Sequence, residues 1–284
     1  MSVVADQPAY RVTGPTAISG DGRRFVHLVT TLALTDWKLR FYGSALGYLW
    51  SLLRPLLLFG ILLFVFSEIV RIGSDVADYP VVLLIGVVLF SYFAEITGDS
   101  VESVVDREQL VRKVSFPRMV VPLSVALAGT FNLALNLVAV TALILITGVE
   151  PRLEWLLVPI PIVVLAVLSA GAGMLLSALY VPFRDARPIW DVVAQGLFYA
   201  TPVFYPVEFL IDRSETLATL AMMNPLAVII VEARHLVLGD SSMGPAKAIG
   251  GEALLLIPLA ILLAVVALGF VTFNRMAPRV AEEL

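Results

Sequence analysis

Long apolar stretches separated by short polar segments dominate this 284-residue chain. A helix needs about 20 apolar residues to cross a hydrocarbon core of about 30 Å. Windows of that kind predict an all-α integral membrane fold with one membrane domain over residues 31–273. The six predicted spans are at about residues 51–70, 80–98, 120–147, 155–180, 188–206 and 253–273.

Before the first predicted span, apolar side chains recur at helical spacing. The pattern predicts an amphipathic helix in the membrane interface, where Trp and Tyr favour the headgroup level. A plain membrane anchor is the alternative role for this helix. We expect a flexible N-terminus at residues 1–30 and a short tail at residues 274–284. The apolar stripe of the interface helix consists of Leu34, Trp37, Phe41, Ala45 and Tyr48.

A charged segment separates the second and third spans. Asp99 and Glu102 have the spacing of a capping box, and valines near one face follow them, which predicts a separate short amphipathic helix. Pro117 ends any continuation of that helix, and Pro122 fits the first turn of the next span. The segment is either a docking element for a partner or an ordinary solvated loop.

The connection at residues 207–252 is long for a loop and contains its own helical patterns. "EFLIDRSETLATLAMM" precedes Asn224 and Pro225, and "LAVIIVEARHLVLG" ends at Gly239. Both stretches are too short to cross a membrane. We expect two short helices, re-entrant or interfacial, on the side of the membrane opposite to the chain's ends.

The distribution of basic residues orients the chain. With six spans, 14 of the 19 Lys and Arg residues lie on the side that holds both termini. Because cytoplasmic loops carry the excess of Lys and Arg, both termini are predicted to be cytoplasmic.

Composition supports the membrane class and excludes several others. The chain is 59% hydrophobic and 15% charged, with no cysteine, so disulfides, thiolate metal sites and cysteine nucleophiles are excluded. It has no H-e-x-x-H type metal motif and no G-x-x-x-x-G-K-[ST] loop. Nothing in it supports nucleic-acid binding. We expect no metal and no cofactor in this chain.

Polar residues inside the spans are few and therefore informative. Asn132 and Asn136 are four residues apart on the third span, as are Gln195 and Tyr199 on the fifth. Hydrogen bonds between helices and the lining of a hydrophilic passage are both open for these pairs. Asp75 and Asp78, in the first outer loop, leave a membrane glycosyltransferase open as a function of a different class.

Four stretches resemble the membrane subunit of ABC-2-type exporters, in the branch that exports cell-surface polysaccharides such as O-antigen, teichoic acid and galactan. The stretches are "DWKLRFYGSALGYLWSLLRPLL" at 36–57, "QLVRKVSFPRMVVPL" at 109–123, "FRDARPIWDVVAQGLFYATPVFYPVE" at 183–208 and "MNPLAVIIVEARHLVLG" at 223–239. The resemblance implies the ABC-2 (type V) exporter fold and a bacterial plasma membrane location. It also implies a homodimer with two copies of an ATP-binding subunit, which holds ATP and Mg. An exporter of small hydrophobic molecules is the alternative within transport.

The resemblance further implies roles for individual residues. The first cytoplasmic loop would be a coupling helix for the ATPase, with Val104, Val105, Asp106, Arg107 and Glu108 in contact and Arg112, Lys113, Phe116, Pro117 and Arg118 holding it against the membrane. A channel for the polymer would be lined by Phe59, Phe66, Tyr92, Gln195, Phe198, Tyr199, Phe204 and Tyr205. The diphosphate of a polyprenyl-linked glycan would bind near Lys38, Arg40 and Arg54.

Overall fold

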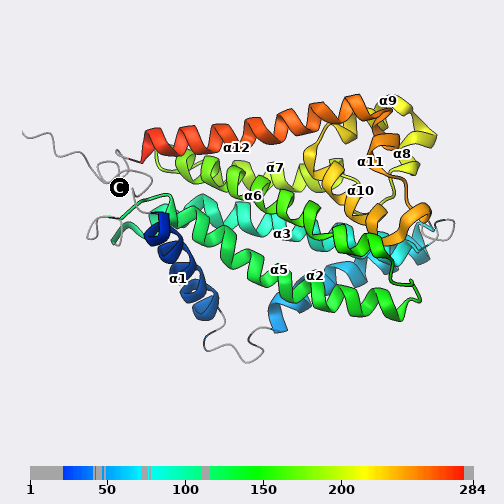
Figure 1. The fold of residues 1–284 in the computed structure, drawn as a ribbon, viewed down its shortest axis with the longest axis horizontal. Helices are drawn as coiled ribbons and strands as arrows, with labels where there is room; N and C mark the ends of the chain where they lie inside the picture. Colours follow the sequence, from blue (N-terminus) through cyan, green and yellow to red (C-terminus); the bar gives the residue numbers. More distant parts are fainter. Residues whose placement is uncertain are drawn as a thin grey trace, which may run out of the picture.

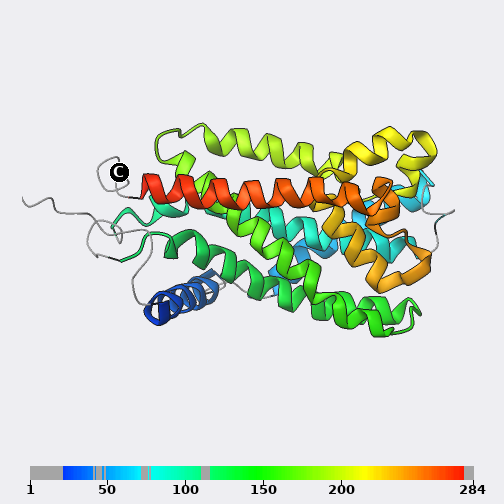
Figure 2. The same ribbon diagram turned by 45° about the horizontal axis from the view of Figure 1, so that its top comes forward.

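The computed structural model is an elongated bundle of helices (Figures 1 and 2). It describes residues 22–40, 42, 47, 49–71, 76, 78–109 and 116–277. Within these ranges five helices are long and apolar enough to cross a membrane, and the bent pair α9 and α10 would make a sixth. The chain is therefore a multi-pass membrane protein, and the predicted all-α membrane fold is confirmed.

Five of the six predicted spans correspond to long helices. Four of these helices have ends within a few residues of the prediction, and α3 (Tyr79–Asp106) continues well beyond the predicted end of its span. The five long helices are α2 (Leu49–Phe64) with the π-helical η1 (Val65–Ile69), α3, α5 (Val120–Ile146), α6 (Pro159–Tyr180) preceded by η3 (Leu153–Leu157), and α12 (Leu256–Met276) preceded by η5 (Glu252–Leu255).

The bundle has two distinct ends. We call the end where α12 finishes, beside α1 (Gly22–Arg40), the proximal end, and the end that carries the short helices the distal end (Figure 1). The short distal helices are α8 (Glu208–Arg213), α9 (Glu215–Met222) and α11 (Pro245–Ile249).

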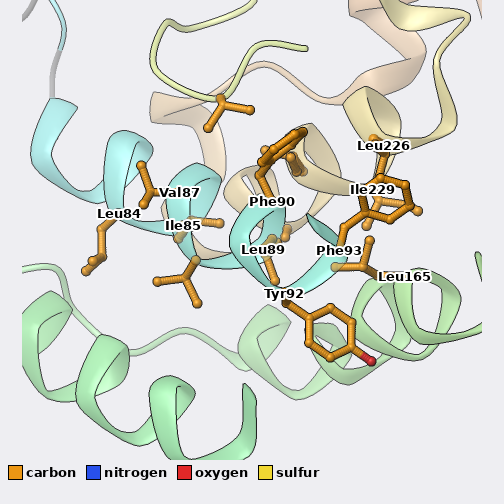
Figure 3. Close-up of a cluster of buried hydrophobic side chains, with 14 of the residues drawn as sticks. Leu84, Ile85, Val87, Leu89, Phe90, Tyr92, Phe93, Leu165, Leu226 and Ile229 are labelled. Atoms are coloured by element: carbon orange, nitrogen blue, oxygen red, sulfur yellow. The ribbon is translucent and has the colours of Figure 1, made fainter. Parts of the chain in front are cut away.

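Helix α3 is the centre of the bundle. Of its most apolar 18-residue window, 78% is buried, against 6% for α2 and 17% for α12. It packs against α2, α5, α6, α7 (Ala186–Ala200) and α10 (Pro225–Leu238). Figure 3 shows Phe90 and Tyr92 leaving α3 on opposite sides, so one helix supports two different neighbourhoods. The Tyr92 hydroxyl lies 2.9 Å from Thr130 Oγ1 on α5.

Small residues allow the closest helix contact. A Cβ added to Gly269 of α12 would lie 2.1 Å from the carbonyl oxygen of Gly171 on α6. Since real side chains do not approach backbone so closely, glycine at 269 is what lets α12 lie against α6. This contact fixes the last span on the bundle.

Helix α7 is shorter than the predicted span at residues 188–206. It ends at Ala200, and its 15 residues cover about 22 Å, less than a hydrocarbon core. Thr201 has extended backbone angles, and the next helix begins at Glu208. The prediction was wrong at this end because "TPVFYP" is apolar, and hydropathy does not distinguish an apolar helix from an apolar non-helical segment.

Side chains satisfy the backbone of residues 201–205. Buried Arg234, on α10, donates to the carbonyl oxygens of Pro202 at 2.6 Å and Val203 at 2.7 Å, and to Tyr205 at 3.3 Å. The Tyr79 hydroxyl donates to the carbonyl of Phe204 at 2.8 Å. An apolar surrounding offers no other donors to a non-helical backbone, so these bonds are what makes the break in the helix tolerable.

Helix α10 is recessed into the bundle instead of lying at its surface. Asn224 caps it by accepting from Leu226 N, Pro225 follows at the first position, and Gly239 ends it with a φ of 62°. Helix α9 meets α10 at an angle of 100°. The connection at residues 207–252 therefore contains α8 and α9 at the distal end and α10 within the bundle, with η4 (Gly239–Ser241) and α11 following. The bend between α9 and α10 is that of a broken span or of a re-entrant loop.

The proximal end differs from the prediction in two places. The interface helix begins at Gly22 and ends at Arg40, so residues 22–30 are helical and not a flexible terminus. Phe41, Ala45 and Tyr48 of the predicted stripe lie outside the described residues. Helix α1 packs on α5, with the Trp37 indole donating to Asn132 at 2.8 Å.

The second difference concerns the segment after Gly98. Asp99 and Glu102 are in the interior of α3, which continues to Asp106, so the predicted capping box is wrong. A turn at Arg107 ends α3, Glu108 and Gln109 are helical again, and residues 110–115 of the predicted short helix lie outside the described residues. Asp99 pairs with Arg40 and Glu102 with Arg187, so both carboxylates have partners along the helix instead of marking a helix start. Pro122 is in the first turn of α5, as predicted.

We expect Arg234→Met to destabilise the protein. The substitution retains a long side chain but removes the donors of three carbonyls in residues 201–205, and should lower the free energy of unfolding by about 3 kcal/mol or more. Thermal unfolding of the purified protein in detergent measures this. The control is Arg213→Met, at an exposed position of α8, which we expect to unfold like the native chain. Equal unfolding temperatures for the two variants would contradict the anchoring role of Arg234.

Candidate functional site

A polar cavity of about 720 Å³ opens between α1, α2, α3, α5 and α7, in the proximal part of the bundle. Its charged lining consists of Arg40, Arg54, Arg187, Glu95, Asp99 and Asp191. Its aromatic lining includes Trp50, Tyr92 and Trp190. A cavity lined by charged and aromatic side chains within a membrane bundle is typical of a binding site for a polar ligand.

The carboxylates and guanidinium groups of the cavity are largely paired. Arg40 donates to Glu95 and to Asp99, both on α3. Arg187, at the start of α7, donates to the carbonyl of Gly98 at 2.8 Å and lies 3.3 Å from Asp191. Burial lowers the pKa of Arg40, but the charges of its two carboxylate partners outweigh burial and raise it. Arg40 therefore stays charged at any ordinary pH.

Arg54 and Asn136 of the cavity have no such partner, and the buried indole N–H of Trp190 lacks a hydrogen-bond acceptor among the described residues as well. Arg54 is exposed and forms no hydrogen bond or ion pair with the described residues. Asn136 is only 9% exposed, lines the cavity, and has no hydrogen-bond partner among the described residues. A guanidinium and a side-chain amide are thus available to a ligand.

The two asparagines of α5 have separate roles. Asn132 donates to Glu95 at 2.9 Å and accepts from Trp37, so it forms hydrogen bonds between helices. Asn136, one turn further along, faces the cavity. The sequence left two roles open for this pair: Asn132 forms hydrogen bonds between helices, and Asn136 lines the cavity.

A second polar cavity, of about 360 Å³, adjoins the first through Arg40, Asp99 and Arg187. Arg107 lies at its edge, paired with Asp36 of α1 and 3.3 Å from the Ser124 hydroxyl. Burial raises the pKa of Asp36, an effect larger than the opposing charge of Arg107. The polar surface therefore continues from the main cavity to the end of α3.

An aromatic ladder, Trp190–Phe93–Phe90–Phe198–Phe204–Tyr205–Phe209, runs from the cavity towards the distal end. Successive ring centroids are 6.1, 6.3, 5.1, 5.7, 4.9 and 6.3 Å apart. Phe66 stacks on Phe204 at 4.9 Å, and Tyr199 contacts both Phe198 and Phe204. The spacing is that of direct aromatic contact.

The ladder brings together five of the eight predicted channel residues. These are Phe66, Phe198, Tyr199, Phe204 and Tyr205. Tyr92 lines the cavity instead, Phe59 is half-buried against the main core, and Gln195 is exposed on α7.

Of the predicted diphosphate residues, Arg40 and Arg54 line the cavity. Lys38 is exposed on α1 and is not part of the lining. The remaining charged lining residues were missed, although Glu95 was visible in the sequence as a carboxylate within a predicted span, which is itself a functional signal.

The predicted coupling residues divide into buried and accessible groups. Val104 is 1% exposed and packs with Met119 and Phe273, so its predicted contact with an ATPase is corrected: in this conformation it has no free surface. Asp106 is exposed, while Val105, Arg107 and Glu108 are half-buried. Phe116 packs on the same cluster as Val104, and Pro117 and Arg118 are buried. Arg112 and Lys113, like Asp75, lie outside the described residues.

Comparison with known proteins identifies relatives for most of the chain. Residues 27–238 match the ABC-2 type transporter family. The O-antigen export system permease protein RfbA of Klebsiella pneumoniae is 29% identical over 210 residues, which cover 74% of this chain and 79% of the relative.

Two further relatives come from other bacteria. RfbA of Myxococcus xanthus, also an O-antigen export permease, is 29% identical over 70% of this chain and 75% of its own length. The polysialic acid transport protein KpsM of Escherichia coli is 24% identical over 74% of this chain and 81% of its own length. The family match spans well over half of the chain and includes every element that lines the cavity, so this protein belongs to the ABC-2 type transporter family.

Proposed function

We propose that this protein is the membrane-spanning permease of an ATP-driven exporter that moves a polyprenyl-diphosphate-linked cell-surface polysaccharide out of the cytoplasm. The observation that carries the proposal is the row of accessible rings that begins at Trp190 in the cavity wall and continues along α7 and the segment after it. These rings are Phe198, Tyr199, Phe204 and Tyr205, whereas Phe90 and Phe93 are buried and support them from the core. Sugar rings stack on aromatic faces without requiring a fixed sequence of hydrogen bonds, so a polymer can slide along them. O-antigen, teichoic acid and galactan are polymers of the expected kind.

The cavity suits the charged end of such a substrate. Guanidinium groups bind phosphate oxygens with paired hydrogen bonds, and Arg40 and Arg54 lie in the lining, with Lys38 on the approach along α1. The Asn136 amide and the Trp190 ring would meet the first sugars. An exporter of small hydrophobic molecules has less need of a cavity with six charged side chains, and the relatives named for polysaccharides also favour the glycan. The glycosyltransferase hypothesis on Asp75 and Asp78 is set aside, because the family is one of transporters.

The proposed assembly is a homodimer with two ATP-binding subunits in a bacterial plasma membrane, with both termini in the cytoplasm. This orientation places the proximal end, with its Asp36–Arg107 pair and the end of α3, on the side where ATP is hydrolysed. ATP and Mg would be held by the partner. Exposed apolar faces of α2 and α7, including Ile61, Phe64 and Val192, offer the surface for the second copy.

Loss of an accessible ring that contacts the ladder should reduce export. Tyr199 is 59% exposed, so Tyr199→Ala removes a ring without emptying the core, and we expect the polysaccharide at the cell surface to fall about fivefold, in line with the loss of about 1 kcal/mol of ring contact. Tyr199→Phe keeps the ring and should export normally. Surface polysaccharide is measured in cells that depend on the plasmid-borne permease.

The matched control is Ile189→Ala, on the same helix and 61% exposed, but without an aromatic ring. It should leave export unchanged. Equal losses for Tyr199→Ala and Ile189→Ala, at equal protein levels, would contradict a role for the ladder.

The accessible coupling residues should bind the ATPase. Reversing charge with Asp106→Arg and Glu108→Arg at the end of α3 should reduce the amount of copurifying ATP-binding subunit by about tenfold, because interface charges set the strength and selectivity of docking. Copurification from cells that express both subunits measures this. Glu154→Arg, an exposed residue of η3 at the distal end, is the control and should bind the partner normally. Undiminished copurification of the double variant would place the docking surface elsewhere.

A further inference from the structure

The C-terminal end of α1 is held over the cavity by two carboxylates of α3. Arg40 is the last residue of α1, and its guanidinium donates to Glu95 and Asp99, one helical turn apart. The three side chains are 39%, 31% and 41% exposed, so ligands and water have access to them. Both pairs lie in the wall of the cavity.

Glu95 connects this contact to the rest of α1. The same carboxylate oxygen that accepts from Arg40 also accepts from Asn132 of α5 at 2.9 Å. Asn132 in turn accepts from the Trp37 indole at 2.8 Å. Three helices, α1, α3 and α5, therefore meet through a single carboxylate.

The charge balance of the cavity works against an incoming anion. Three arginines line it, and three carboxylates offset them. Arg54 is without an acceptor among the described residues, while Arg40 and Arg187 are paired. An anion thus meets one available guanidinium and must compete with carboxylates for a second.

Unpaired polar groups in the cavity wall offer contacts to a ligand, among them the buried indole N–H of Trp190, which has no hydrogen-bond partner in the described residues. Asn136 is nine-tenths buried, lines the cavity, and has no hydrogen-bond partner among the described residues. The Asn136 amide is accessible from the cavity, so water or a ligand can satisfy it. Arg54 and Asn136 together suit a ligand with negative charge and hydroxyl groups.

We propose that Glu95 and Asp99 form a latch: they act as internal anions on Arg40 until the diphosphate of a ligand displaces them. This inference rests on the proposed function and adds its regulation. A diphosphate that first binds Arg54 can extend to Arg40, because its two phosphoryl groups can each bind a guanidinium. Loss of the two carboxylate contacts releases the end of α1.

Release of α1 would transmit ligand binding in the cavity to the region that is proposed to contact the ATPase. Asp36, one turn before Arg40, pairs with Arg107, which directly follows α3. A shift of α1 therefore changes a contact at the junction with the coupling residues. An empty cavity keeps α1 latched, and a loaded cavity unlatches it.

The latch predicts that removing a carboxylate tightens binding. The purified complex of the full chain with its ATP-binding subunit is titrated calorimetrically with farnesyl diphosphate and, separately, with inorganic pyrophosphate. Asp99→Asn and Glu95→Gln keep the shape of each side chain but not its charge. We expect each to bind farnesyl diphosphate about five- to tenfold more tightly than the native protein, because a competitor for Arg40 is lost.

The matched control is Asp191→Asn. It removes one negative charge from the same cavity, but Asp191 pairs with Arg187 and not with Arg40. If the latch exists, Asp191→Asn gains clearly less affinity than Asp99→Asn. Amide hydrogen exchange of Gly22–Arg40 should also rise on ligand binding in the native protein, which a merely structural ion pair would not produce.

Three outcomes separate the latch from the proposed function. If Arg54→Gln weakens native binding but Asp99→Asn binds no more tightly than Asp191→Asn, the latch is overturned and the diphosphate site stands. If no variant binds either probe, the latch and the diphosphate site both fail. If Asp99→Asn tightens pyrophosphate as much as farnesyl diphosphate, the latch is supported and its ligand is a diphosphate without need of a lipid chain.

Discussion

The buried guanidinium of Arg234 makes the rest of the arrangement possible. Within an apolar bundle a chain can leave helical geometry only where the protein itself supplies hydrogen-bond partners. Arg234 supplies them to Pro202, Val203 and Tyr205, and Tyr79 supplies one to Phe204. The break after α7 turns Phe204 and Tyr205 against their neighbours in the aromatic ladder. The same side chain secures α10 inside the bundle.

Around that anchor, α3 relates the two functional regions. Its first half supplies Phe90 and Phe93 to the ladder, and its second half supplies Glu95 and Asp99 to the cavity. One buried helix therefore connects ring contacts on the distal side with ion pairs on the proximal side. Because α3 packs on five other helices, its position in the bundle is fixed from several sides.

Hydropathy alone predicted most of the spans, because bilayer thickness sets the length of an apolar helix. It failed at residues 201–206, where the backbone is non-helical but apolar, and only the tertiary contact with Arg234 explains it. It also failed at Asp99 and Glu102, which lie within α3 although their charges indicated its end. Their partners, Arg40 and Arg187, are far away in sequence, so no local pattern could have shown that these charges are neutralised.

Several residues of the site could be predicted from the sequence, but the contacts between them could not. Arg40, Arg54 and the aromatic residues of 198–205 were identified from the sequence and its resemblance to exporters. Phe90 and Phe93 looked like ordinary core residues of an apolar helix, and their place in the ladder depends on how α3 meets α7. Val104 lies in a stretch whose sequence pattern indicated a docking surface, but the packing of α6 and α12 covers its side chain.

The measurement that most directly tests the central claim, passage of a glycan along α7 and the ladder, is protection of single cysteines. The chain has no native cysteine, so the background is zero. Gln195→Cys, exposed on α7 one helical turn before Phe198 and Tyr199, is compared with Val193→Cys, nearly opposite on the same helix, using a charged, membrane-impermeant thiol reagent. With export stalled by a hydrolysis-deficient ATP-binding subunit and glycan present, we predict that Gln195→Cys labels slowly and regains labelling when glycan synthesis is blocked, whereas Val193→Cys does not respond to glycan. Labelling of Gln195→Cys that is indifferent to glycan would contradict the account.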